Sequence, residues 1–81
     1  MNKAQTTDAE LDASGLYCPL PVLRAKTALD KMSDNSILKL IATDPGSQKD
    51  IEAYTQQSGR KLLDTQHTNN CFIFYIEKTV N

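Results

Sequence analysis

The stretch Cys18-Pro19-Leu20-Pro21 constrains the fold of this chain more than any other, because it fixes where a helix begins. Proline is tolerated in the first turn of a helix, where backbone amides have no intrahelical acceptor to lose. The residue before a proline is pushed into extended conformation, which is the backbone state of a helix N-cap. Apolar residues then recur at the spacing of one helical face, at Val22, Ala25, Leu29 and Met32. The sequence therefore predicts a helix that starts at Pro19, with Cys18 as its N-cap.

The two prolines also indicate which amide would contact the sulfur. Pro21 has no N–H, so the Leu20 amide is expected to donate to Cys18, with the Val22 amide as the next choice. A thiol at the positive end of a helix has its pKa lowered from about 8.5 to roughly 3.5–7.5. We therefore predict that Cys18 is a reactive cysteine with thiolate available near neutral pH. The alternative is that Cys18 serves only as a small buried hydrophobic residue.

The size and composition of the chain restrict its class. Its 81 residues suit one domain, expected over residues 9–79 after a flexible polar tail at residues 1–8. A net charge of −1 argues against general nucleic-acid binding, and a direct nucleic-acid contact is not expected. No apolar run approaches the roughly 18 residues of a membrane span, and the first ten residues lack the apolar stretch of a signal peptide. A cytoplasmic protein without a membrane contact is predicted, expected to act as a monomer.

Two cysteines in such a compartment are poor evidence for a disulfide. A metal site is not expected either, because Cys18 and Cys71 lie far apart and His67 is the only histidine. No cofactor is predicted.

Hydrophobic patterns predict the element order β-α-β-α-β-β. The expected strands are Ala9–Ala13, Ser36–Thr43, Lys61–His67 and Cys71–Lys78, and the first helix is Pro19–Met32. A second helix ends near Ser58, with Gly59 as its left-handed C′ residue. It starts in one of two ways: Asp44 caps it with Pro45 following, or Ser47 caps it with Asp50 closing a capping box. Its apolar stripe is thin, with Ile51, Tyr54 and Ala53 as candidates.

This order predicts an α/β (α+β) fold: a two-layer sandwich with a mixed four-stranded sheet and both helices on one face. The first three strands are expected to be parallel, and the hairpin through Thr68-Asn69-Asn70 makes the fourth antiparallel to the third. The open face of the sheet would carry Ile37 or Ile41 with Ile73 and Tyr75. Docking of a partner and ordinary scattered exposure are both compatible with that pattern.

The residues around Cys18 exclude several kinds of thiol chemistry. A cysteine hydrolase needs an orienting base, and His67 lies in a strand before a hairpin. Thiol–disulfide exchange of the Cys-x-x-Cys type needs a second cysteine at the position that Pro21 occupies. A single accessible nucleophile remains, one able to hold a group and pass it on. A persulfide suits this best, because its anion would be stabilised at a helix N-terminus.

At these residues the chain resembles the TusA/SirA-type small sulfur carriers. The family's Cys-Pro-x-Pro motif is matched by Cys18-Pro19-Leu20-Pro21, preceded by Leu11-Asp12 and Gly15-Leu16. A second match is Asp44-Pro45 followed by Asp50-Ile51, and the resemblance extends from Leu11 to Lys78. The family's fold is a two-layer β-α-β-α-β-β sandwich.

The resemblance implies a role in sulfur transfer. Cys18 would accept a persulfide from a cysteine desulfurase or a rhodanese and relay it to an acceptor protein, with Pro19, Leu20 and Pro21 shaping the helix start. It implies a sulfurtransferase-type carrier rather than a stand-alone turnover enzyme. Members serve tRNA 2-thiouridine synthesis, sulfur oxidation or cofactor supply. Two other hypotheses remain: a non-catalytic regulatory or protein-binding module that uses the open sheet face, and RNA binding, against which neutral charge and few aromatic residues count.

Overall fold

The computed structural model describes residues 7–78 and confirms the predicted element order. The elements are β1 (Ala9–Ala13), α1 (Leu20–Lys31), β2 (Ile37–Ala42), α2 (Ser47–Ser58), β3 (Lys61–Thr68) and β4 (Cys71–Glu77). Most of the tail expected at residues 1–8, and residue 79 at the other end of the expected domain, lie outside the described residues. Asp8 is held against the sheet: its amide donates to the Ile37 carbonyl at 2.8 Å, and the Ile37 amide donates to its Oδ2 at 2.9 Å.

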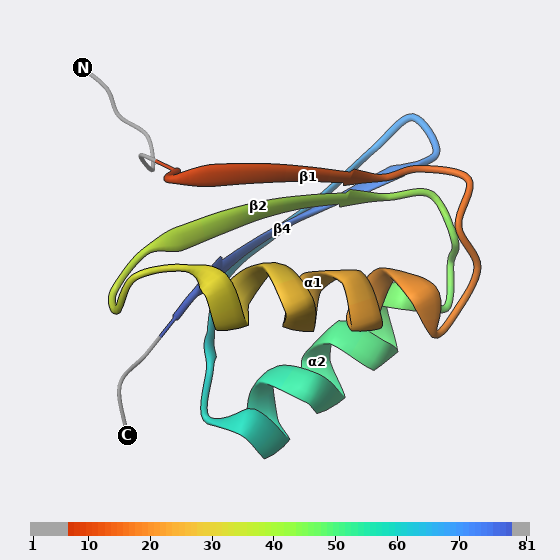
Figure 1. The fold of residues 1–81 in the computed structure, drawn as a ribbon. Coiled ribbons are helices and arrows are strands. Elements are labelled where there is room, and N and C mark those ends of the chain that lie inside the picture. The colour runs from red at the N-terminus through yellow and green to blue at the C-terminus, as the bar shows by residue number, and fades with distance from the viewer. Residues whose placement is uncertain (1–6, 79–81) are drawn as a thin grey trace.

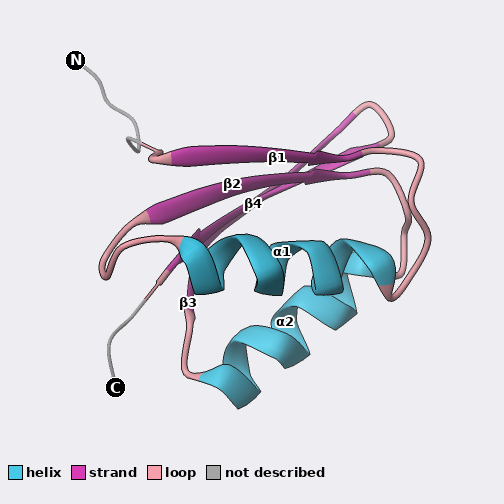
Figure 2. Cartoon of the chain, viewed as in Figure 1, coloured by secondary structure: helices cyan, strands magenta, loops and turns pink. Residues whose placement is uncertain are grey.

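The four strands form one mixed sheet in the order β1-β2-β4-β3 (Figures 1 and 2). β1 is parallel to β2, and β4 is antiparallel to both of its neighbours. Consequently β1, β2 and β3 all run in one direction, as the sequence predicts. The structure also places β4 between β2 and β3, an order that the sequence patterns do not predict. The carboxyl ends of β1, β2 and β3 therefore meet at one edge of the sheet.

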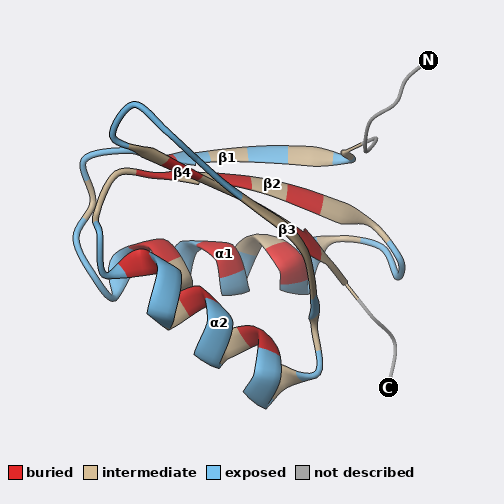
Figure 3. Ribbon diagram, turned by 180° about the vertical axis from the view of Figure 1, so that it is seen from behind, coloured by how far each residue is buried: buried red, intermediate tan, exposed pale blue. Residues whose placement is uncertain are grey.

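Both helices cover the same face of the sheet, which confirms the two-layer architecture (Figure 1). Each helix carries buried residues along the side nearer the sheet and exposed residues along its outer side (Figure 3). The core lies between the layers and consists of Ala13, Ala25, Leu29, Leu38, Leu40, Ala42, Ile51, Phe72, Phe74 and Ile76. On the uncovered face, the residues Ile37, Ile41, Ile73 and Tyr75 are half-buried. None of the described helices is long and apolar enough to cross a membrane.

The start of α2 differs from both predicted capping arrangements. Its N-cap is Gly46, and no side chain caps the helix. Ser47 is buried and its hydroxyl donates to the Asp44 carbonyl at 2.6 Å. This bond holds the turn before the helix and leaves the Asp44 and Asp50 carboxylates available for other contacts. The predicted helix end is confirmed, because Gly59 follows Ser58 with a φ of 81°. Of the three residues in the expected apolar stripe, Ala53 is exposed.

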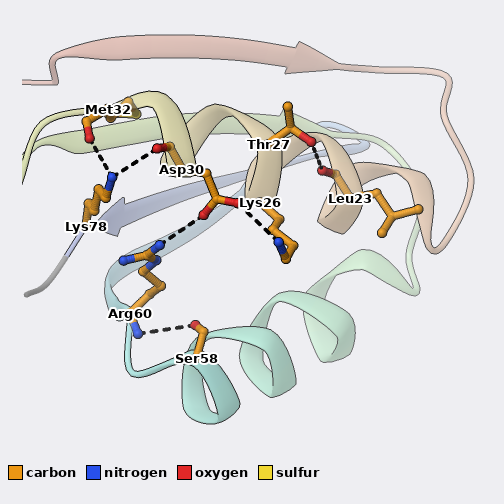
Figure 4. Close-up of polar contacts among 8 residues, drawn as sticks. All are labelled: Leu23, Lys26, Thr27, Asp30, Met32, Ser58, Arg60 and Lys78. Atoms are coloured by element: carbon orange, nitrogen blue, oxygen red, sulfur yellow. Dashed lines mark hydrogen bonds and ion pairs between the residues drawn. The ribbon is translucent and has the colours of Figure 1, made fainter. Parts of the chain in front are cut away.

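The carboxyl end of α1 is fastened to the rest of the chain by polar contacts around Asp30 (Figure 4). Lys26 and Arg60 pair with its carboxylate at 3.1 and 3.2 Å. The hydrogen bond from Lys26, followed by the contact with Arg60, lowers the pKa of Asp30 below its usual value. Lys78 donates to the carbonyls of Asp30 and Met32 at 3.2 and 2.6 Å. These contacts hold the end of α1 that lies away from Cys18.

The β3–β4 hairpin turns through Asn69 and Asn70, with φ of 49° and 61°, so the expected asparagine turn is confirmed with Thr68 inside β3. A left-handed backbone costs roughly 1–2 kcal/mol per residue for ordinary side chains, and glycine is exempt from that cost. We expect Asn70→Ala to lower the free energy of unfolding by about 1 kcal/mol. Asn70→Gly should leave it unchanged or raise it slightly. Urea unfolding compares the two variants, and equal stability would argue against this turn geometry.

Candidate functional site

Two loops meet at the carboxyl ends of β1 and β2 and form the site. The β1–α1 loop spans residues 14–19 and the β2–α2 loop spans residues 43–46. The Gly15 amide donates to Thr43 Oγ1 at 2.9 Å, which ties the first loop to the end of β2. Gly15 has a φ of 81°, which a glycine adopts readily. In α/β sheets, loops at the carboxyl ends of parallel strands are the usual position of a functional site.

Helix α1 starts one residue later than predicted. Its N-cap is Pro19, no side chain caps it, and Pro21 occupies its first turn as expected. The Leu20 amide donates to the Tyr17 carbonyl at 2.8 Å, which closes a turn before the helix. The predictions that Cys18 is the N-cap and that the Leu20 amide donates to its sulfur are therefore wrong. The physical reason is that a backbone carbonyl, a stronger acceptor than sulfur, takes that amide.

Cys18 is exposed and is held by two carboxylates from the β2–α2 region. Its backbone amide donates to Asp44 Oδ2 at 2.8 Å. Its thiol donates to Asp50 Oδ2, so the sulfur points toward the first turn of α2. Gly46 lies between these contacts, since a Cβ there would come within 3.4 Å of Asp44 Oδ2 and 3.7 Å of the Cys18 Cβ. The loops therefore approach each other closely around the cysteine.

These carboxylates determine the acidity of the thiol. The hydrogen bond to Asp50, together with desolvation and the negative charges of Asp50 and Asp44, raises the pKa of Cys18 above its ordinary value. The prediction of a lowered pKa is wrong. The dipole of α1 does not dominate, because the sulfur lies outside the first turn of that helix and beside two negative charges. This direction of the pKa shift favours the neutral thiol over the thiolate at Cys18.

Exposed apolar side chains lie next to Cys18 along the chain. Tyr17 is 75% exposed, Leu20 41% and Leu23 51%, and they are the large hydrophobic residues exposed within the described part of the chain. Leu20 and Leu23 are three residues apart and share one side of α1. We call these three residues the apolar rim. A second feature is an open groove of about 250 Å³ between α1 and α2, lined by Pro19, Val22, Asp50, Ala53, Tyr54 and Gln57.

The other two candidate residues, His67 and Cys71, lie at the β3–β4 hairpin. His67 stacks on Phe72 with ring centroids 4.2 Å apart, and within residues 7–78 no hydrogen bond joins it to Cys18. Cys71 is half-buried at the start of β4, and both cysteines are free thiols. Among the described residues, no group of three or more His, Cys, Asp or Glu side chains could hold a metal ion.

The sequence reasoning missed Asp44 and Asp50 as partners of Cys18. The sequence patterns assign both residues to the start of the second helix only, although each belongs to the second stretch that resembles the sulfur carriers. The available signal was their position. Asp44 follows a predicted strand, at the edge of the sheet where the β1–α1 loop also begins.

Comparison with known proteins agrees with this architecture. A family model for sulfurtransferase TusA matches residues 9–78. The "Sulfur carrier protein TusA" of Allochromatium vinosum is 51% identical over 72 residues, which cover 89% of this chain and 95% of the relative. A "Putative sulfur carrier protein" of Neisseria meningitidis is 43% identical over 67 residues, covering 83% of this chain and 90% of the relative.

A crystal structure of a SirA-like protein from Desulfitobacterium hafniense superposes with a TM-score of 0.76. It covers 89% of this chain and 99% of the other, with 22% sequence identity, and so supports the fold. The family match over nearly the whole described chain, together with the 51% identical relative, leads to one assignment. The chain belongs to the TusA sulfurtransferase family.

Proposed function

We propose that this protein is a sulfur carrier that accepts a sulfur atom on Cys18 as a persulfide and relays it to an acceptor protein. The donor would be a cysteine desulfurase or a rhodanese. The observation that carries the proposal is the exposed Cys18 thiol, presented between two loops at the start of α1. Membership of the family and the names of its relatives as sulfur carriers support it.

The chemistry needed at Cys18 is a simple exchange. The Cys18 thiolate attacks the outer sulfur of the donor's persulfide, and the donor's S–S bond breaks with its electron pair on the donor sulfur. Cys18, which gave its proton to solvent before the attack, gains the new S–S bond, and the donor thiolate takes up one proton. No net oxidation occurs, so no redox cofactor is required. The same exchange in the opposite sense passes the sulfur onward.

A protein partner fits the surroundings of Cys18 better than a small substrate alone. The apolar rim of Tyr17, Leu20 and Leu23 offers contact area beside the thiol, as is usual for protein interaction sites. The runner-up is a non-catalytic regulatory or protein-binding module on the open sheet face. That reading has less support, because the apolar residues of the open face are half-buried and the strongly exposed ones lie at the Cys18 end. Supply of sulfur for tRNA 2-thiouridine, or for another sulfur pathway, is compatible with this proposal.

The proposal is tested by incubating the full chain with a cysteine desulfurase and L-cysteine, then measuring its intact mass. A parallel reaction supplies a rhodanese and thiosulfate. We expect the mass to increase by one sulfur atom with at least one donor, and dithiothreitol to remove the added sulfur. An unchanged mass with both donors would contradict the proposed function.

A further inference from the structure

The carboxylate of Asp50 has a position that the proposed sulfur transfer does not require. Its Oδ2 accepts the hydrogen bond from the Cys18 thiol, and its side chain also lines the groove between α1 and α2. A carboxylate can accept that hydrogen bond only while the sulfur carries its proton, because a thiolate has no proton to donate. The contact therefore exists in one protonation state of the cysteine and not in the other.

The charged groups around the sulfur do not favour the thiolate form of Cys18. Asp44 in the β2–α2 loop and Asp50 in α2 are the charged groups that face Cys18. The β1–α1 loop and the first turn of α1 contribute only Tyr17 as a titratable side chain besides Cys18 itself. Lys49 precedes Asp50 in α2 and is exposed. Within residues 7–78, the ion pairs found join Lys26 and Arg60 to Asp30, and none joins a cation to Asp44 or Asp50. A thiolate at this position would face two negative charges.

We propose that Asp50 is the positioning residue that holds the resting Cys18 as a neutral thiol, so that the sulfur becomes a nucleophile only when its contact with Asp50 is broken. This inference rests on the proposed function. In the exchange described above, the proton leaves Cys18 for solvent once the Asp50 contact opens, before the sulfur attacks the donor. The raised pKa of Cys18 agrees with this role. The resting carrier would thereby react slowly with small electrophiles that reach its exposed sulfur.

The test measures alkylation of Cys18 by iodoacetamide in the full chain between pH 6 and pH 10, because thiolate is the form that reacts. Peptide mass spectrometry separates Cys18 from Cys71. Below the pKa, a decrease of one pKa unit raises the thiolate fraction about ten-fold. The less basic thiolate is also a weaker nucleophile, which offsets part of that gain in rate. We therefore expect Asp50→Asn to alkylate roughly three- to ten-fold faster than the unmodified chain at pH 7, with its profile moved to lower pH.

Asp34→Asn is the matched control, because it removes the same charge from an exposed residue beyond the other end of α1. Its profile should coincide with that of the unmodified chain. Circular dichroism checks that each variant is folded, and Asp50→Ser replaces Asp50→Asn if the latter is not. Coinciding profiles for the Asp50 variant and the unmodified chain would overturn the inference, as would an equal shift in Asp34→Asn. Sulfur loading by the desulfurase is measured on the same samples. If the unmodified chain loads sulfur but the Asp50 variant shows no shift of its alkylation profile, the role of Asp50 is refuted and the proposed sulfur transfer is not.

Discussion

Cys18→Ser is expected to abolish sulfur loading completely, whereas Cys71→Ser should load to the level of the unmodified chain. A serine hydroxyl cannot form a persulfide, and Cys18 is the cysteine exposed between the two loops of the site. Cys71 is half-buried at the start of the strand β4, and is therefore less accessible than Cys18. Intact-mass measurement after incubation with a cysteine desulfurase and L-cysteine reports the loading of each variant.

The fold of Cys18→Ser should be preserved, because the residue is exposed and a serine hydroxyl can also donate to Asp50. Its thermal unfolding should therefore resemble that of the unmodified chain, which separates a chemical effect from a structural one. Full loading of Cys18→Ser, or loss of loading in a folded Cys71→Ser, would show that the sulfur is carried elsewhere.

Phe74→Ala is expected to cause the largest loss of stability. Phe74 lies fully buried in β4 between the sheet and the helices, where its register partners are Leu40 on β2 and Thr65 on β3. Truncation of a buried phenylalanine costs about 3–5 kcal/mol, since it removes apolar contacts and leaves a cavity. At about 0.05–0.15 kcal/mol per residue, a chain of 81 residues has a total stability of about 4–12 kcal/mol. We expect Phe74→Ala to be partly or largely unfolded at 37 °C.

Ile73→Ala provides the control within the same strand. Ile73 is the neighbour of Phe74 on the opposite, uncovered face and is half-buried. Its truncation should lower the free energy of unfolding by a clearly smaller amount, measured by urea unfolding followed by circular dichroism. Losses of equal size would contradict the assignment of the core to the helix-covered face.

Much of this fold follows from patterns that are local in sequence. The strand Ala9–Ala13 has the bounds that its alternating residues predict, and Gly59 ends α2 because a left-handed residue suits glycine. The asparagine turn of the hairpin is likewise a local preference. The position of β4 between β2 and β3 is different in kind. It depends on pairing between strands distant along the chain, which no local pattern specifies.

The candidate site likewise has a part that the local sequence predicts and a part that depends on residues distant along the chain. The motif at residues 18–21 locates the cysteine and the helix start to within one residue. The direction of the thiol pKa depends on Asp44 and Asp50, which lie 26 and 32 residues away and approach only when the two loops pack together. The helix dipole alone therefore predicts the wrong direction for the pKa shift of Cys18. The local backbone was predictable, and the electrostatic environment required the tertiary structure.

The central claim is that Cys18 carries a sulfur atom from one protein to another, and isotope labelling tests it most directly. The chain is loaded by a cysteine desulfurase with ³⁵S-labelled L-cysteine, repurified, divided and analysed in two ways. Peptide mapping without reductant should place the label in the peptide that contains Cys18. Incubation with a sulfur-acceptor protein of the same organism should move the label to that protein and return the chain to its unloaded mass. Label in the peptide that contains Cys71, or label that stays on the chain with every acceptor offered, would contradict the claim.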